Sequence, residues 1–164
     1  MPPRNIIEQM ATANPDGFGF VSEHDYFRTM DFNEFYKRVR RVKKSENLIM
    51  HFRWATHGSK KVTNCHPFTD GSTFFAHNGV LSLPSISDKT DSELCFTRFI
   101  KPAIDLMGID GAKEVIEAHR EGSRFAIMKD GEIHTYGEYY RMSGCLYSNL
   151  RFIHAGTLRR FRCA

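Results

Sequence analysis

Apolar residues recur at two different periods along the chain, and the period changes from segment to segment. Residues 5–13 carry one apolar side, after prolines of the kind tolerated at the start of a helix. Residues 31–45 repeat apolar side chains every three to four positions, and Asp31 with Glu34 has the form of a capping box. The apolar positions of this segment are Phe32, Phe35, Tyr36, Val39 and Val42. Both segments are predicted to be helices.

Alternating apolar and polar residues predict strands elsewhere. Residues 18–22 and 26–30 form one predicted hairpin, and Asp130-Gly131 is a strong turn signal for another. The strands of the second hairpin are residues 124–128 and 132–136, and further strands are predicted over 47–56, 72–76, 141–147 and 151–155. Two more helices are predicted, over 92–106 with a bend at Pro102 and over 112–119. Because helices and strands fall into separate runs, the predicted class is α+β with largely antiparallel sheets.

Length and composition fit one folded domain that covers residues 1–164. Hydrophobic residues make up 41% of the chain and charged residues 26%, as in ordinary globular proteins. No apolar run approaches the roughly 20 residues needed to span a bilayer, and no signal segment is evident at the amino end. The four cysteines show no short paired spacing, so we expect reduced thiols. These features predict a cytoplasmic protein with no membrane association.

The net charge of +4 is modest but unevenly distributed. Six cations lie within eight residues of the second predicted helix, and three more lie in the tail segment 159–162. The six are Lys37, Arg38, Arg40, Arg41, Lys43 and Lys44. They fall between the apolar positions, as on a solvated helix face, and a patch of this kind can also contact an acidic macromolecule. Both interpretations remain open from the sequence.

Polar chemistry is concentrated where the predicted strand 47–56 ends. Arg53 offers a planar set of donors suited to a carboxylate or a phosphate, and Trp54 offers a large flat wall. Thr56 adds a hydroxyl, and His57 adds a titratable group beside a glycine. A strand end with these residues is a candidate binding site.

Further motifs follow in a fixed order, and together they resemble the class II glutamine amidotransferases of the N-terminal-nucleophile hydrolase superfamily. The motifs are Asn14-Pro15-Asp16-Gly17-Phe18-Gly19, Arg53-Trp54-Ala55-Thr56-His57-Gly58, His66-Pro67-Phe68, His77-Asn78-Gly79 and Thr90-Asp91-Ser92-Glu93. The resemblance covers roughly residues 5–150. It implies a four-layer αββα sandwich, which the periodicity alone does not predict.

The resemblance also implies a role for each matching residue in binding glutamine. Arg53 would bind the α-carboxylate bidentately with help from Thr56, and Asp91 would bind the α-ammonium group. Trp54 and His57 would line the pocket. The Asn78 side-chain amide and the Gly79 backbone N–H would form the oxyanion hole, the catalytic element that stabilises the charge developing on the amide oxygen.

The nucleophile of the family is missing from its expected place. In the family a first-residue cysteine attacks the glutamine amide while its own α-amine acts as the base. This chain begins Met1-Pro2-Pro3 and has no cysteine before Cys65, so both the nucleophile and its strand are absent. Cys65 has His66 beside it but no α-amine to act as a base. We therefore expect a degenerate relative that binds glutamine weakly and acts as a binding or regulatory protein; the alternative is a fragment or mis-started form of an active glutaminase domain that supplies ammonia to a separate acceptor domain.

Other chemistries find little support in the sequence. The cluster His51, His57, Cys65, His66 and His77 has none of the usual zinc-ligand spacings. Neither a Gly-x-Ser-x-Gly nucleophile elbow nor a Gly-x-x-x-x-Gly-Lys phosphate loop occurs. We expect no metal site and no cofactor.

Overall fold

Two antiparallel sheets face each other in the computed structural model, which describes residues 1–55, 59–83 and 89–153. The first sheet has the order β2-β1-β3, with β1 at Phe18–Ser22, β2 at Tyr26–Thr29 and β3 at Leu48–Phe52. The second has the order β4-β5-β6-β7. Its strands are β4 at Phe68–Thr69, β5 at Thr73–Asn78, β6 at Arg124–Lys129 and β7 at Glu132–Tyr136.

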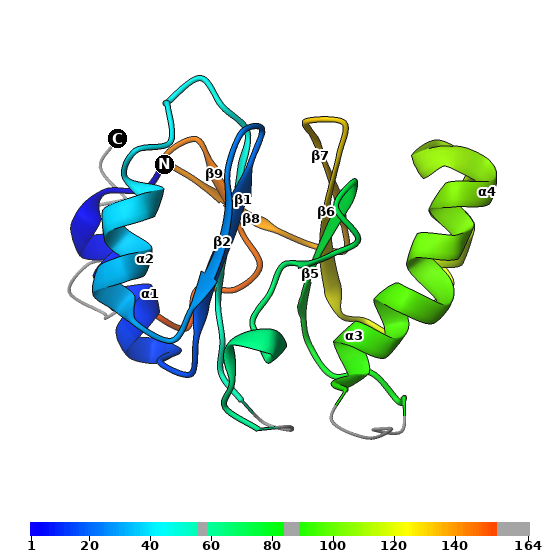
Figure 1. The fold of residues 1–164 in the computed structure, drawn as a ribbon, viewed down its shortest axis with the longest axis horizontal. Helices are drawn as coiled ribbons and strands as arrows, with labels where there is room; N and C mark the ends of the chain where they lie inside the picture. Colours follow the sequence, from blue (N-terminus) through cyan, green and yellow to red (C-terminus); the bar gives the residue numbers. More distant parts are fainter. Residues whose placement is uncertain (56–58, 84–88, 154–164) are drawn as a thin grey trace.

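Helices cover the outer face of the first sheet. Helices α1 (Arg4–Ala13) and α2 (Phe32–Val39) lie to its left in Figure 1. The core beneath them is rich in aromatic rings, and Phe35 packs against Phe18, Phe20 and Phe52 at centroid distances of 5.3–6.0 Å. Helix α2 begins at the predicted cap, because the Asp31 side chain accepts hydrogen bonds from the backbone N–H groups of residues 33 and 34.

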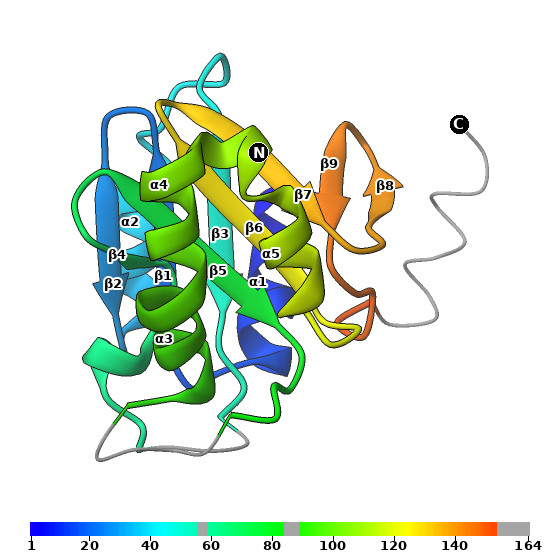
Figure 2. The same cartoon turned by 90° about the vertical axis from the view of Figure 1, so that its right-hand side faces the viewer.

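The second sheet is covered by one long helical run and a short helix. The run consists of α3 (Asp91–Cys95), a π-helical turn (Phe96–Ile100) and α4 (Lys101–Gly111). Helix α5 (Lys113–Ala118) follows, and Figure 2 shows α4 and α5 lying over the face of β5, β6 and β7. Buried residues of the helical run and of α5, among them Phe96, Ile100 and Ile116, pack onto the sheet. The sheet residues in this core include Phe75, Phe125 and Ile127.

Two small elements complete the described chain. A 3-10 turn at Val62–Asn64 precedes β4, and a hairpin of β8 (Tyr140–Met142) and β9 (Cys145–Tyr147) follows β7. The hairpin is anchored by Tyr147, whose ring packs against that of Phe152 at 5.5 Å, and both residues belong to the core beneath α1 and α2.

The α+β class and the antiparallel sheets agree with the sequence prediction. Figure 1 shows, from left to right, helices α1 and α2, the first sheet, the second sheet, and the run from α3 to α4. Between the sheets lies a small apolar cluster of Val21, Ile49, Ala76 and Met128. None of the helices in the described part of the chain has the length and apolar composition that crossing a membrane requires.

Several predicted boundaries are wrong. Helix α2 ends at Val39 instead of continuing to residue 45, because residues 40–46 form tight turns that lead the chain into β3. Strand β3 ends at Phe52, since its partner β1 begins at Phe18 and the chain turns before it. Strand β5 continues beyond residue 76 to Asn78, because β6 supplies a partner for each residue up to that point.

The predicted bend at Pro102 and the predicted strand over 151–155 are also wrong. Pro102 lies inside a helical run that continues without a break from the π-helical turn into α4, and the non-helical residue is Gly108 with φ 71°. Residues 151 and 152 form a turn, and residues 154 and 155 lie outside the described ranges. The predicted strand 141–147 is a hairpin turned at Ser143 and Gly144, both with positive φ.

Candidate functional site

The ends of β3 and β5 lie side by side because histidines join the two sheets. The His51 ring nitrogen Nε2 lies 3.1 Å from the backbone carbonyl oxygen of His77. His66 packs against His51 with ring centroids 4.2 Å apart, and its Nδ1 accepts a hydrogen bond of 3.1 Å from the His77 backbone N–H. Arg53 lies two residues after His51, just beyond the end of β3. Asn78 lies one residue after His77 and is the last residue of β5.

The three histidines of this contact are held in the neutral form. Burial lowers the pKa of His51 and of His77 to about 4, and it lowers the pKa of His66 well below its usual value. The neighbouring imidazoles and the Arg53 guanidinium lower the pKa of His66 further, whereas the Asp91 carboxylate acts in the opposite direction on His77. The cluster therefore acts as a polar but uncharged spacer between the sheets.

Arg53 is fixed by the turn that precedes β1. Its backbone N–H donates to the Gly17 carbonyl at 2.8 Å, and its carbonyl accepts from the Asp16 N–H at 2.9 Å. The Asp16 carboxylate also accepts from the Ala55 N–H at 3.0 Å and pairs with Lys60, which lowers the pKa of that carboxyl. The Arg53 side chain is only 6% exposed and donates from Nη1 to the Ser59 carbonyl at 3.2 Å.

Of the other residues predicted at this strand end, one can be placed. Trp54 is 63% exposed, so its ring is available as a wall to a ligand or a partner. Thr56 and His57 lie outside the described residues.

Asn78 and Gly79 are each held by a serine from a distant segment. The Asn78 amide nitrogen donates to Ser148 Oγ at 2.8 Å. Gly79 has φ 149° and passes so close to Ser123 that an added Cβ would lie 2.1 Å from its Oγ. Ser123 in turn hydrogen-bonds through its hydroxyl to the Val80 carbonyl at 3.3 Å. Only glycine fits at position 79.

The Asp91 carboxylate is oriented by three donors. One oxygen accepts from the Ser92 backbone N–H at 2.7 Å and from the Ser92 hydroxyl at 3.1 Å, and the other accepts from the Leu81 N–H at 3.1 Å. The Ser92 hydroxyl also lies 2.7 Å from Nδ1 of His77. Asp91 is thereby connected to the segment that carries Asn78 and Gly79 at two points. One is His77, which precedes Asn78 and is reached through Ser92, and the other is Leu81, which follows Gly79 by two residues.

A cavity of about 530 Å³ opens beside Asn78. It is bounded by the residues of β3, by the ends of β5 and β6, and by the β8–β9 hairpin. Its polar wall includes His51, His77, Asn78, Ser148 and Arg124. Arg53, Gly79 and Asp91 do not line this cavity. The roles predicted for Arg53 and Asp91, as ligands of the α-carboxylate and the α-ammonium group of one glutamine, therefore stay predictions.

Among the described cysteines, Cys65 and Cys95 are buried. Cys65 packs beneath Gly17 with its sulfur near Met30, and burial raises the pKa of its thiol. Cys95 lies in the core of the second sheet, where burial raises the pKa of its thiol to about 12. Cys145 on β9 is half-buried and contributes to the cavity wall. Within the described residues, no three His, Cys, Asp or Glu side chains are arranged to hold a metal ion.

The sequence prediction missed the serines that support the site. Ser92 had a local signal, since it stands beside Asp91 in a quoted motif. Ser123 and Ser148 had none, because each meets its partner only through the pairing of distant segments. Asp16 was quoted only as part of a turn motif, and its bond to the loop after Arg53 is a tertiary feature.

Comparison with known proteins agrees with this arrangement of motifs. Residues 33–121 match the family model described as glutamine amidotransferases class-II. A probable glutamine amidotransferase DUG3 of Saccharomyces cerevisiae is 35% identical over 88 residues, which is 43% of this chain and 24% of the yeast protein. Glutamine--fructose-6-phosphate aminotransferases of Acinetobacter baylyi and Caulobacter vibrioides are each 52% identical over 33 residues, which is 20% of this chain and 5% of each relative.

The match to these relatives is confined to part of each protein. The aligned region spans about a quarter of the yeast relative and a much smaller share of the bacterial ones. The family model, in contrast, covers more than half of this chain, including Arg53, Asn78, Gly79 and Asp91. The chain belongs to the class II glutamine amidotransferases.

Proposed function

We propose that this chain is a glutamine-binding domain whose pocket is formed by the ends of β3 and β5 and the start of α3. The observation that supports this most is the His51–His77 contact, which holds the segments of Arg53 and Asn78 together. The backbone N–H groups of Leu81 and Ser92 donate to the Asp91 carboxylate, and the bond from Leu81 connects the start of α3 to the segment that follows β5. A site that binds glutamine needs a cation for the α-carboxylate, an anion for the α-ammonium group and a donor for the side-chain amide oxygen, and these three segments supply a guanidinium, a carboxylate and an amide.

Each group has a chemical task in this proposal. The planar guanidinium of Arg53 pairs with the glutamine α-carboxylate, and its low exposure strengthens that pairing by limiting screening by water. The Asp91 carboxylate, already oriented by backbone donors, takes the α-ammonium group. The Asn78 amide and the Gly79 N–H donate to the oxygen of the side-chain amide.

We propose further that this chain binds glutamine without hydrolysing it. Hydrolysis by a thiol needs a thiolate close to Asn78. Cys65 and Cys95 are buried and have raised pKa values, which keep them protonated at neutral pH. Cys145 lines the same cavity as Asn78, but as an internal residue it has no free α-amine to act as the base. The purified chain should therefore release no glutamate above background. Turnover that disappears on thiol alkylation would contradict this proposal.

A binding measurement tests the pocket itself. Titration calorimetry with L-glutamine should give weak but saturable binding, and Asp91→Asn or Arg53→Gln should weaken it about tenfold or more, since each removes a charge-assisted contact. Asp105→Asn, the same chemical change on the far helix α4, is the matched control and should bind as wild type. Equal affinity in all four proteins would rule out Arg53 and Asp91 as ligands.

The alternative function is the glutaminase part of a larger amidotransferase, which supplies ammonia to an acceptor domain outside this chain. It is favoured by the small share of each relative that the chain matches, 24% in the yeast protein and 5% in the bacterial ones. Reading the coding DNA upstream of Met1 for an in-frame start that encodes cysteine distinguishes the two functions. A longer protein with such a start should release glutamate from glutamine.

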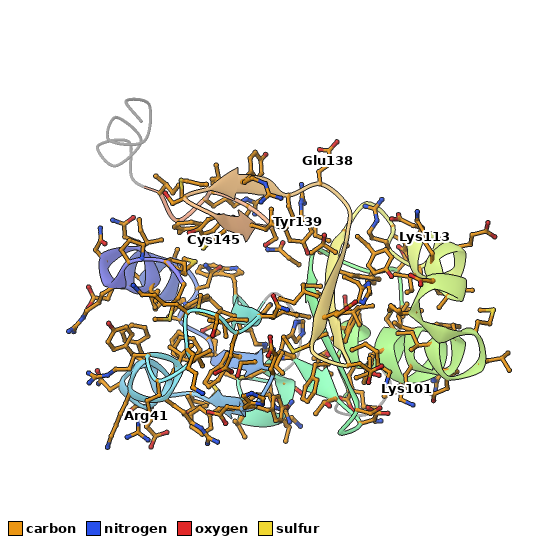
Figure 3. All side chains as sticks on the ribbon, turned by 90° about the horizontal axis from the view of Figure 1, so that it is seen from above. Arg41, Lys101, Lys113, Glu138, Tyr139 and Cys145 are labelled. Atoms are coloured by element: carbon orange, nitrogen blue, oxygen red, sulfur yellow. The ribbon has the colours of Figure 1, made fainter. Side chains whose placement is uncertain are left out.

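A binding role toward an acidic macromolecule is the second candidate, and the exposed cations near α2 favour it. Arg38 is engaged with Asp25 in a two-point ion pair at 2.6 and 2.9 Å. The other five are exposed on α2 and on the turns after it, and these are Lys37, Arg40, Arg41, Lys43 and Lys44. Figure 3 shows Arg41 on the outer side of the molecule, away from Cys145 in the hairpin. The tail cations at 159, 160 and 162 lie outside the described residues.

Charge reversal tests this second role. Arg40→Glu with Lys44→Glu should reduce recovery of acidic partners from cell lysate, and wild-type recovery should fall with salt, because exposed charges are screened over about 8–10 Å. Reversal of Arg98 and Lys113 on the opposite helical layer is the matched control. Equal recovery by wild type and both double variants at low and physiological salt would leave the patch as a solvated face.

A further inference from the structure

We propose that Ser148 is a positioning residue that orients the Asn78 amide for the side-chain amide of the bound amino acid. The inference rests on the proposed glutamine site and adds a residue to it. The Asn78 Nδ2 atom donates to Ser148 Oγ at 2.8 Å, across 70 residues of sequence. Both residues line the cavity beside the end of β5.

An asparagine amide needs such a partner to act as a donor in a fixed direction. Its terminal torsion is broad and roughly two-fold, so the NH₂ and the carbonyl oxygen can exchange places. In one orientation the amide presents N–H to the ligand's carbonyl oxygen, and in the other it presents an oxygen that repels it. A hydroxyl that accepts one N–H leaves the second N–H in a defined direction, in the plane of the amide.

Ser148 is itself held firmly enough for this task. It directly follows Tyr147, which is buried and stacks near Phe152 at 5.5 Å. The chain beyond it is a turn closed by bonds from the Arg151 N–H to the Asn149 side chain and from the Ile153 N–H to the Leu150 carbonyl. The hydroxyl is thus carried by backbone that is anchored on both sides.

The position of Asn78 is fixed independently of Ser148. Asn78 is paired with Arg124 at the end of the β5–β6 ladder, and the next residue, Gly79, packs against Ser123. Removal of the Ser148 hydroxyl should therefore leave the backbone of the site in place. What it should change is the orientation of the Asn78 amide.

The test compares two ligands that differ only in the group Asn78 recognises. L-Glutamine and L-norvaline share the α-carboxylate, the α-ammonium group and a five-carbon chain, but only glutamine carries the amide. Ser148→Ala should weaken glutamine binding about three- to tenfold, the range of a neutral hydrogen bond, and leave norvaline binding unchanged. Ser148→Thr keeps the hydroxyl and should restore glutamine binding, and Ser72→Ala, in the exposed turn before β5, is the control.

A second readout separates failure of this inference from failure of the glutamine site. The NMR signals of the Asn78 side-chain NH₂ should show slower hydrogen exchange in wild type and Ser148→Thr than in Ser148→Ala. If wild type binds glutamine and Ser148→Ala weakens both ligands equally or neither, the positioning role is wrong. If wild type binds neither ligand, the glutamine assignment fails, and equal exchange rates in wild type and Ser148→Ala then overturn the Ser148–Asn78 contact as well.

Discussion

The imidazole of His51 on β3 is hydrogen-bonded to the backbone carbonyl of His77 on β5, and this one bond of 3.1 Å connects the two facing sheets next to the site. Because the carbonyl can only accept, His51 donates from Nε2, and because burial lowers its pKa to about 4 the ring is neutral with an unprotonated Nδ1. That Nδ1 is buried and has no hydrogen-bond partner among the described residues. Protonation there would place a charge between the sheets without compensation.

This contact predicts that stability falls as the solution is acidified. His51 and His77 have pKa values of about 4 in the folded chain, against about 6.5 in an unfolded one. As pH falls from 6.5 to 4 the unfolded state binds protons that the folded state excludes, so the free energy of unfolding decreases, by up to about 1.4 kcal/mol per pH unit for each histidine. Urea unfolding at pH 7.5, 6 and 5 measures this slope.

Two variants assign the slope to the buried cluster. His51→Gln keeps an N–H donor for the His77 carbonyl and removes one titrating group, so the slope should become shallower. His24→Gln changes an exposed histidine in the turn between β1 and β2 and should leave the slope as in wild type. A slope unaffected by His51→Gln would mean that other groups control the acid response.

Gly79→Ala should destabilise the fold and remove ligand binding together. The new Cβ would lie 2.1 Å from Ser123 Oγ and 3.0 Å from Ser123 Cα, in a backbone conformation unfavourable to L-residues. We expect a loss of about 2 kcal/mol or more in the free energy of unfolding, measured in urea. Gly71→Ala, with φ 100° and open space around the Cβ, should show only the smaller backbone penalty of about 1 kcal/mol. Equal losses would refute the close approach to Ser123.

Phe35→Ala should be among the most damaging changes in the layer beneath α2. The ring is fully buried and contacts Phe18, Phe20 and Phe52, so its removal leaves a large cavity and should cost about 3–5 kcal/mol. Tyr140→Ala, at a ring that is 50% exposed, should cost less than about 0.5 kcal/mol. Because Phe52 directly precedes Arg53, we also expect weaker glutamine binding in Phe35→Ala, which calorimetry would detect.

Thiol labelling should rank the three described cysteines by burial. In a Cys163→Ser background at pH 8, one thiol, Cys145, should react readily with a disulfide reagent in the native protein. Cys65 and Cys95 should react only after unfolding, since both are buried and burial raises the pKa of both thiols. Mass spectrometry of the labelled peptides identifies the site. Rapid labelling of Cys65 would reopen its candidacy as a nucleophile.

The local sequence was sufficient to predict a helix, strand or turn wherever that element is determined by its own residues. The period of apolar residues gave helix α1 to within one residue, and the alternation at Phe18–Ser22 gave strand β1 with its hairpin partner. Asp130-Gly131 turns β6 into β7 with φ 51° and 79°, as its composition predicted. The order of the motifs was sufficient for the family, and four of the five motifs lie within residues 33–121, which match the family model.

Tertiary structure decided where those elements stop and what supports the site. Strand β5 extends to Asn78 because β6 pairs with it that far, which no property of residues 73–78 alone indicates. The bonds from Asn78 to Ser148 and from Asp91 to the Leu81 N–H depend on how separate segments are packed. A serine has no local signature as an orienting group, since its hydroxyl gains that role only when the packed sheets and the β8–β9 hairpin bring it within hydrogen-bond distance of one amide.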